Sequence, residues 1–123
     1  MDIGLTDKVV VVTGATANIG RAIALGFAAE GVRLVAVGRD CDAGERLVTE
    51  ALAAGAEQAV FVARDLLDPA APASILEAAS ALGPVAVLVN NVGGNVGAVI
   101  YLASESAAFV TGQVFPVEGG TLL

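Results

Sequence analysis

The residues best placed to take part in chemistry are those of "TGATANIGRA" (13–22), a glycine-rich stretch between two apolar segments. The segment before it, "KVVVVTG" (8–14), is typical of a buried strand, and "IGRAIALGFAAEG" (19–31) has helical spacing. Glycines allow a tight turn and a close approach of the backbone to a bound group. The helix N-terminus presents free N–H groups that suit a pyrophosphate. The stretch predicts an anion-binding turn, with an ordinary strand-to-helix turn as the alternative.

Residues for proton transfer are not found in a useful arrangement. The one tyrosine, Tyr101, is followed four residues later by Glu105, and a nearby carboxylate disfavours an ionised phenol. The only lysine, Lys8, starts the first predicted strand, whereas ligands of parallel sheets bind at the carboxyl ends of the strands. Ser104 and Ser106 have no histidine or lysine in range to activate them, and Cys41, after the second strand, is interpreted as a small spacer and not as a nucleophile. We therefore predict no catalytic residue in this chain.

The elements that must position the turn alternate between strand and helix. The helix after the turn is expected to bury one face, formed by Ile19, Ala22, Ile23, Gly26 and Phe27. Further strands are predicted at 32–38, 58–64 and 85–90. Further helices are predicted at 42–55, capped by Gly55, and at 68–83, with Asp68 and Pro69 at its start.

The remainder of the chain predicts two short elements. A helix is expected at about 96–104, and "GQVFPVEG" (112–119) reads as a fifth strand. Pro116 favours an edge position for that strand. The alternation predicts an α/β fold with a mainly parallel sheet between layers of helices. With no internal repeat and no linker, residues 1–123 are expected to form one domain.

Composition and charge limit the classes of function. Hydrophobic residues make up 56% and charged residues 15%, which favours a sheet buried on both faces or a surface that needs a partner. No apolar run approaches the roughly 18 to 20 residues of a membrane span. The net charge of −7 disfavours nucleic acid and anionic lipid, and the absence of histidine predicts no metal site. The lone cysteine and a start without signal-peptide features fit the cytoplasm.

The turn resembles that of the short-chain dehydrogenases/reductases, which reads T-G-x-x-x-G-x-G. Asn18 stands where the middle glycine belongs, and asparagine tolerates positive φ better than most residues. The resemblance implies a Rossmann-like three-layer sandwich and a bound dinucleotide. The cofactor-binding residues that it implies in the turn are Gly14, Ala15, Thr16, Ala17, Asn18, Ile19 and Gly20.

Two more matches lie at the ends of the second and third strands. In "VGRD" (37–40), Arg39 corresponds to the family residue that favours a 2′-phosphate, hence NADP over NAD, while the neighbouring Asp40 opposes that preference and leaves NAD possible. In "RDLLD" (64–68), the resemblance implies that Asp65 bonds the adenine and that Leu66 flanks it. Alternatively, Arg39 is a solvated surface residue and Asp65 only starts a turn.

The last two matches are "NNVGG" (90–94), similar to the family's N-N-A-G, and "FVTGQVFPVEGG" (109–120), similar to its V-T-G-Q…V-D-G-G. The first implies that Asn91 and Gly93 lie near the cofactor. Alternatively, Asn90 and Asn91 bond only to their own backbone. Five matches in the proper order make coincidence implausible.

The resemblance covers the chain in two pieces, 1–94 for the family's first half and 97–123 for its last helix and strand. The family's middle normally carries a catalytic Ser, a Tyr-x-x-x-Lys pair and a supporting Asn. The main hypothesis is an NADP(H)-binding domain that keeps the adenosine and pyrophosphate half of the site without efficient hydride transfer. The alternatives are an oxidoreductase completed by a partner chain, and a non-enzymatic assembly module or a deletion or engineered minimal domain.

Without the middle, the fourth strand needs a new neighbour. One solution brings the 112–119 strand beside it, giving the order 3-2-1-4-5 through a right-handed crossover. Another is pairing between chains, which together with the apolar composition predicts a homo-oligomer.

Overall fold

The sheet of this protein has five parallel strands in the order β3-β2-β1-β4-β5. The computed structural model describes residues 4–16, 18–91 and 114–116. The α/β class and the strand order predicted from the sequence are both confirmed. The strands are β1 (Val9–Thr13), β2 (Arg33–Gly38), β3 (Gln58–Ala63), β4 (Val85–Asn90) and β5 (Val114–Pro116).

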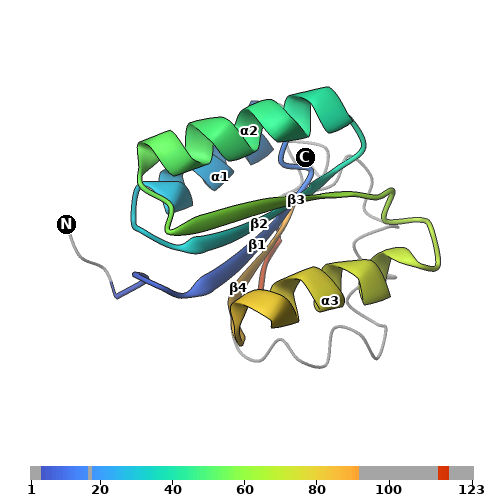
Figure 1. Ribbon diagram of the computed structural model, residues 1–123. Coiled ribbons are helices and arrows are strands. Elements are labelled where there is room, and N and C mark those ends of the chain that lie inside the picture. The colour runs from blue at the N-terminus through green and yellow to red at the C-terminus, as the bar shows by residue number, and fades with distance from the viewer. Residues whose placement is uncertain (1–3, 17, 92–113, 117–123) are drawn as a thin grey trace.

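Helices cover both faces of the sheet (Figure 1). α1 (Asn18–Ala28) and α2 (Cys41–Ala54) lie on one face, and α3 (Ala71–Leu82) lies on the other. β1 is central, and its apolar residues alternate between two cores, with Val10 and Val12 facing α1 and α2. Val9 and Val11 belong to the core under α3. The run of four valines is thus explained by burial on both faces, as expected of a parallel sheet.

The fifth strand lies beside β4 in the described segment 114–116. Its backbone pairs Val114 with Leu88 and Pro116 with Asn90, in parallel. The strand expected over 112–119 is therefore present in part, next to the strand whose edge would otherwise be open. The helix expected at about 96–104 lies outside the described residues.

The buried face of α1 differs from the one expected. Its fully buried positions are Gly20, Ala24 and Ala28, while Ile19 is 47% exposed. Ile23 and Phe27, which were expected to be buried, are only partly so and pack against the margin of the core. The prediction had assigned the largest apolar side chains of the helix to its buried face. The helix instead presents its smallest residues to the sheet, because these permit close approach of the two backbones.

The other two helices begin one to three residues away from their predicted starts at 42 and 68, and Gly55 caps α2 as predicted. α2 begins after Asp40, whose carboxylate accepts a hydrogen bond of 3.1 Å from the Ala43 N–H. α3 begins at Ala71 rather than near Asp68. Asp68 instead accepts a hydrogen bond of 2.9 Å from the Ala70 N–H within a preceding turn. Pro72 fits the first turn of the later start, where its missing N–H costs nothing.

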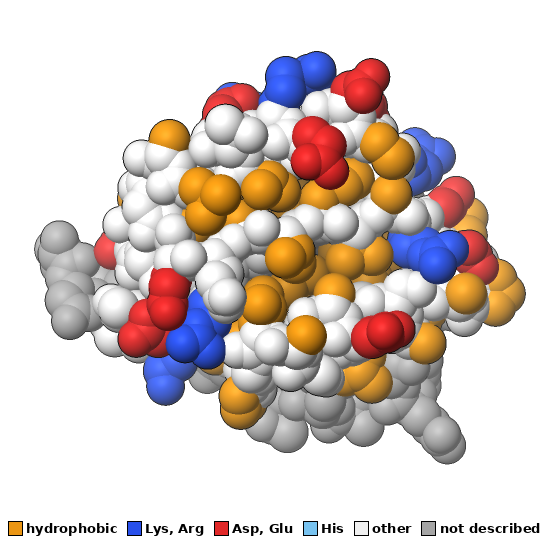
Figure 2. Space-filling model, in the orientation of Figure 1, with side chains coloured by type: hydrophobic (Ala, Val, Ile, Leu, Met, Phe, Trp, Pro, Cys, Tyr) orange, Lys and Arg blue, Asp and Glu red, His pale blue; other side chains and the backbone are white. Residues whose placement is uncertain are grey.

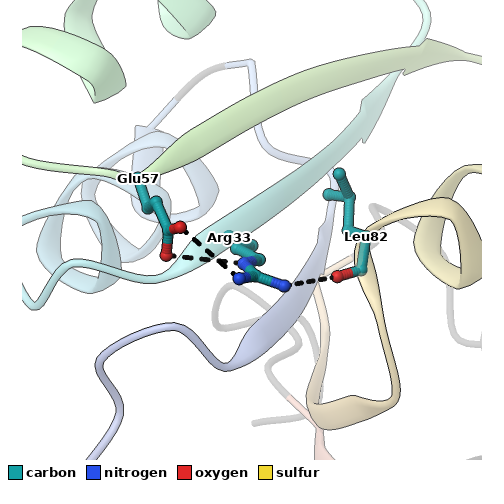
Figure 3. Close-up of polar contacts among 3 residues, drawn as sticks. All are labelled: Arg33, Glu57 and Leu82. Atoms are coloured by element: carbon teal, nitrogen blue, oxygen red, sulfur yellow. Dashed lines mark hydrogen bonds and ion pairs between the residues drawn. The ribbon is translucent and has the colours of Figure 1, made fainter.

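Arg33 joins three elements at the amino edge of the sheet (Figure 3). Its Nη1 donates a 2.8 Å hydrogen bond to the carbonyl oxygen of Leu82, the last residue of α3. Its Nε and Nη2 each lie 3.4 Å from a carboxylate oxygen of Glu57, just before β3. The cation therefore neutralises an acid and satisfies a helix-terminal carbonyl at once.

β3 forms one edge of the described sheet, and β5 forms the other. Its residues Ala59 to Val62 are all apolar and only partly buried, and the strand carries no charge and no proline. Figure 2 shows hydrophobic side chains between the two helical layers on this side of the molecule. None of the helices in the described part of the chain is both long and apolar enough to cross a bilayer.

Candidate functional site

The glycine turn lies at the carboxyl end of β1 and leads into the N-terminus of α1. Gly14 has φ of 59° and Asn18 has φ of 55°. Asn18 thus adopts a left-handed conformation, which asparagine tolerates, at the position where the family has glycine. Between them, the N–H of Ala15 donates to the carbonyl oxygen of Val37 at 3.0 Å, which fastens the turn to the end of β2. Because the chain turns this tightly after β1, the N-terminus of α1 lies at the carboxyl edge of the sheet.

Gly14 and Gly20 are required by close packing inside the turn. A Cβ at Gly14 would collide with the carbonyl oxygen of Asn91, and a Cβ at Gly20 would collide with the carbonyl oxygen of Gly14. The side-chain amide of Asn91 donates a 3.2 Å hydrogen bond to that same Gly14 oxygen. The absence of a Cβ at these two positions therefore allows β1, α1 and the end of β4 to pack closely together. This is the packing that a dinucleotide-binding turn needs.

Thr13 and Asn91 also join the carboxyl ends of β1 and β4. The Thr13 hydroxyl donates to the carbonyl oxygen of Val89 at 3.3 Å and accepts from the Asn91 N–H at 2.9 Å. Thr13 is fully buried. The Asn91 side chain bonds the carbonyl oxygen of Gly14, a residue of another segment, and not its own backbone as in the alternative considered for the asparagine pair. Any contact of Asn91 with a cofactor stays a prediction.

Asn90 is the unusual polar residue of this edge. It is 2% exposed, and neither its side-chain nitrogen nor its side-chain oxygen has a hydrogen-bond partner within the described part of the chain. A buried amide without partners is costly, so this position is unfavourable for the stability of the fold.

Arg39 and Asp40 lie side by side after β2, with different environments. The Arg39 side chain is 81% exposed. The Asp40 carboxylate is occupied as the N-cap of α2. The sequence alone left these two residues in opposition over a 2′-phosphate. In the structure the Arg39 guanidinium is exposed and forms one ion pair, with Asp65, whereas Asp40 already accepts a hydrogen bond from a helix N–H.

Leu66, which was predicted to flank the adenine, is buried, and its binding role stays a prediction. It is 6% exposed and belongs to the core under α3. Its neighbour Leu67 is 62% exposed and was not singled out from the sequence. In "DLLD" the two leucines look equivalent, and only the turn decides which one faces solvent. Asp65 sets that turn, because its carboxylate accepts a 3.0 Å hydrogen bond from the Leu67 N–H.

The predicted site residues form two groups in the structure. The turn residues adjoin Asn91, and Arg39 adjoins Asp65, with 4.0 Å between Nη1 and Oδ2. Ala17 and Gly93 lie outside the described residues. Their binding roles, and those of the other predicted residues, stay predictions. The residues that are described fit a pyrophosphate-binding turn, since the glycine packing and the asparagine conformation both match its requirements.

Lys8 lies at the opposite edge, as the sequence predicted. It precedes β1 and lines a cavity of about 220 Å³ together with Arg33, Pro84 and Val85. The glycine turn follows the other end of the same strand. Lys8 is therefore separated from the turn by the length of β1.

Comparisons with known proteins agree with this geometry. A model of the short chain dehydrogenase family matches residues 8–111. The chain is 39% identical over 90 residues to the NADP-dependent (R)-specific alcohol dehydrogenase of Lentilactobacillus kefiri, which covers 72% of this chain and 35% of that protein. It is 43% identical over 94 residues to hydroxyacyl-CoA dehydrogenase ChsB1 of Mycobacterium tuberculosis, covering 72% and 29%. The chain thus spans about a third of the length of these relatives.

Solved structures give the same picture. The chain superposes on L-sorbose reductase from Gluconobacter frateurii, solved with NADPH and L-sorbose, with a TM-score of 0.72 and 30% identity over 89% of this chain and 46% of that one. It superposes on the apo-form of glucose dehydrogenase from Caenorhabditis elegans with a TM-score of 0.68 and 30% identity, covering 86% and 47%. With its fold, its glycine turn and a family match over most of its length, this chain belongs to the short-chain dehydrogenase/reductase family of oxidoreductases.

Proposed function

We propose that this chain binds the adenosine and pyrophosphate half of NADP(H). The observation that carries the proposal is the turn after β1, where Gly14 and Gly20 pack too closely for any Cβ and Asn18 holds a positive φ. These features place the N-terminus of α1 at the carboxyl edge of the sheet. Free N–H groups and the positive end of the helix dipole would bind the pyrophosphate there.

The preference for NADP over NAD rests on Arg39 and Asp40. Arg39 is exposed and would pair with a 2′-phosphate, for which a guanidinium provides matched donors. Asp40 is the residue that would otherwise bond a ribose hydroxyl and repel the phosphate, but its carboxylate caps α2. The solved neighbour with NADPH and the NADP-dependent relative support the same preference.

Isothermal titration with NADPH and with NADH tests the proposal. Because a charge-assisted hydrogen bond contributes about 1.5–3 kcal/mol, Arg39→Ala should weaken NADPH binding by about tenfold or more and leave NADH binding nearly unchanged. Arg46→Ala is the matched control, since Arg46 is an exposed arginine further along α2. Absence of heat with both dinucleotides at millimolar concentration would defeat the proposal.

We further propose that the chain does not carry out efficient hydride transfer alone. A bound nicotinamide supplies the hydride for carbonyl reduction, and the family pairs it with a tyrosine and a lysine that handle the proton. The one lysine of these 123 residues, Lys8, precedes β1 at the amino edge of the sheet. NADPH oxidation with a panel of ketones and aldehydes should therefore remain at the rate of the uncatalysed reaction. Turnover that Gly14→Val abolishes would contradict this and favour an enzyme completed by a second chain.

Self-association remains part of the proposal. The described sheet has two edge strands, β3 and the three-residue β5, and β3 is the longer one, apolar and partly exposed. Such an edge invites pairing. Light scattering should show a species larger than a monomer, and a monomer at high concentration would count against it.

A further inference from the structure

Arg39 and Asp65 meet because β2 and β3 stay paired to their last residues. The Arg64 N–H donates a 2.9 Å hydrogen bond to the carbonyl oxygen of Gly38, which continues the ladder beyond the last paired residues of the two strands. Arg39 follows Gly38 and Asp65 follows Arg64, so the two charged side chains are neighbours. Nη1 of Arg39 lies 4.0 Å from Oδ2 of Asp65. Arg39, which is predicted to bind a phosphate, is therefore already paired with a carboxylate.

The two partners are not held equally. Asp65 accepts the Leu67 N–H with its other oxygen, and its own carbonyl accepts the Asp68 N–H at 2.9 Å. Its carboxylate is thus oriented by the turn that follows β3. The Arg39 side chain is 81% exposed, and the ion pair with Asp65 is the one polar contact of its guanidinium within the described residues. Asp65 is therefore fixed, and Arg39 is the partner that can reorient.

Asp65, rather than Asp40, is the acid that acts on Arg39. Asp40 is adjacent in sequence, but its carboxylate bonds the Ala43 N–H at the start of α2. The neighbouring Arg64 is likewise occupied by other groups, the carboxylate of Asp68 at 3.7 Å and the hydroxyl of Ser74 at 3.1 Å. The two acids of the turn after β3, Asp65 and Asp68, therefore pair with different arginines, and only Asp65 pairs with the predicted phosphate ligand, Arg39.

We propose that Asp65 is a specificity-determining residue that lowers the preference of this chain for a 2′-phosphate. This inference rests on the proposed binding of NADP(H). To pair with Arg39, the phosphate must displace a fixed carboxylate and then remain near its negative charge. A nucleotide without that phosphate meets neither cost. Asp65 therefore reduces the difference between the affinities for nucleotides with and without the 2′-phosphate, whereas Arg39 increases that difference.

The test uses 2′,5′-ADP and 5′-ADP, which carry the adenosine end of the two dinucleotides and do not depend on a nicotinamide subsite. Asp65→Asn removes the charge but keeps an oxygen to accept the Leu67 N–H. It should raise the affinity for 2′,5′-ADP relative to 5′-ADP by about two- to fivefold, the range expected for an exposed charge pair. The gain should shrink in 0.5 M salt, because exposed charges are screened.

Asp68→Asn is the matched control. It removes the same charge from the same turn and keeps the acceptor for the Ala70 N–H, but it acts on Arg64. It should leave the ratio of the two affinities unchanged. In the ligand-free protein, the side-chain N–H resonance of Arg39 should shift in Asp65→Asn and not in Asp68→Asn.

Each other result contradicts the inference. Equal gains in both variants would indicate a general charge effect, and an equal loss for both nucleotides in Asp65→Asn would indicate direct bonding of adenine by Asp65. Wild-type protein that binds both nucleotides, with an unchanged ratio in Asp65→Asn, removes this inference alone. Wild-type protein that binds neither removes the proposed function as well.

Discussion

The side-chain amide of Asn91, directly after β4, donates a 3.2 Å hydrogen bond to the carbonyl oxygen of Gly14, directly after β1. The two residues are distant in sequence and adjacent in space because β1 and β4 are neighbouring parallel strands. The bond fixes the first peptide of the glycine turn. It therefore connects the shape of the candidate binding site to a residue outside the turn itself.

Removal of this bond should loosen the turn. We expect Asn91→Ala to lower the free energy of unfolding by about 0.5–1.5 kcal/mol, the net contribution of one intramolecular hydrogen bond. Urea unfolding followed by circular dichroism measures the change. Asn90→Val provides the contrast: Asn90 is buried with an unpartnered amide, so the variant should be neutral or stabilising. A larger loss in Asn90→Val than in Asn91→Ala would contradict this account of the edge.

Two glycines of α1 should respond oppositely to alanine. A Cβ at Gly20 meets the Gly14 carbonyl and the Asn91 amide, whereas a Cβ at Gly26 meets nothing within 4 Å. Gly20→Ala should destabilise by about 3 kcal/mol or more, because backbone atoms cannot move aside cheaply. Gly26→Ala should stabilise by about 0.5–1 kcal/mol through lower entropy of the unfolded chain. Thermal unfolding of both variants checks the pair, and a stable Gly20→Ala would exclude the close turn.

The contacts of Arg33 should make it more important for stability than an ordinary surface arginine. Arg33→Met should cost about 1–2 kcal/mol, because it leaves the Leu82 carbonyl and Glu57 without their cation. Arg21→Met is the control. Arg21 pairs with Glu50, and both side chains are about 40% exposed, so its loss should cost no more than about 1 kcal/mol. Hydrogen exchange should locate the effect of Arg33→Met at the end of α3, and equal costs would argue against a special role.

Asp40 should behave as a helix cap. Asp40→Ala removes the acceptor for the Ala43 N–H and should lower stability by about 1 kcal/mol. Asp40→Ser keeps an acceptor at the N-cap and should stay within a few tenths of a kcal/mol of wild type. Chemical denaturation of the two variants distinguishes them. If serine does not rescue the loss seen with alanine, the carboxylate acts through something other than the cap.

The sequence by itself determined the alternation of strands and helices, because period and turn residues are local signals. Together with the family resemblance, it also offered the observed order of the strands as one of two solutions and allowed a positive φ at Asn18. Valine runs identified strands buried on both faces, and asparagine in place of glycine indicated a left-handed residue. Each of these features depends on residues close in sequence, on a general rule of chain connection, or on the resemblance to a known family.

Only the tertiary structure decided which side chains are free to bind. The prediction from sequence missed that Asp40 caps α2, although its bond to the Ala43 N–H is local. It could not show that Arg39 faces Asp65, because that contact depends on where β2 and β3 end beside each other. It misplaced the buried face of α1, because close packing on the sheet selects small residues rather than the most apolar ones. Nor could it separate buried Leu66 from exposed Leu67, since a single turn after β3 orients both.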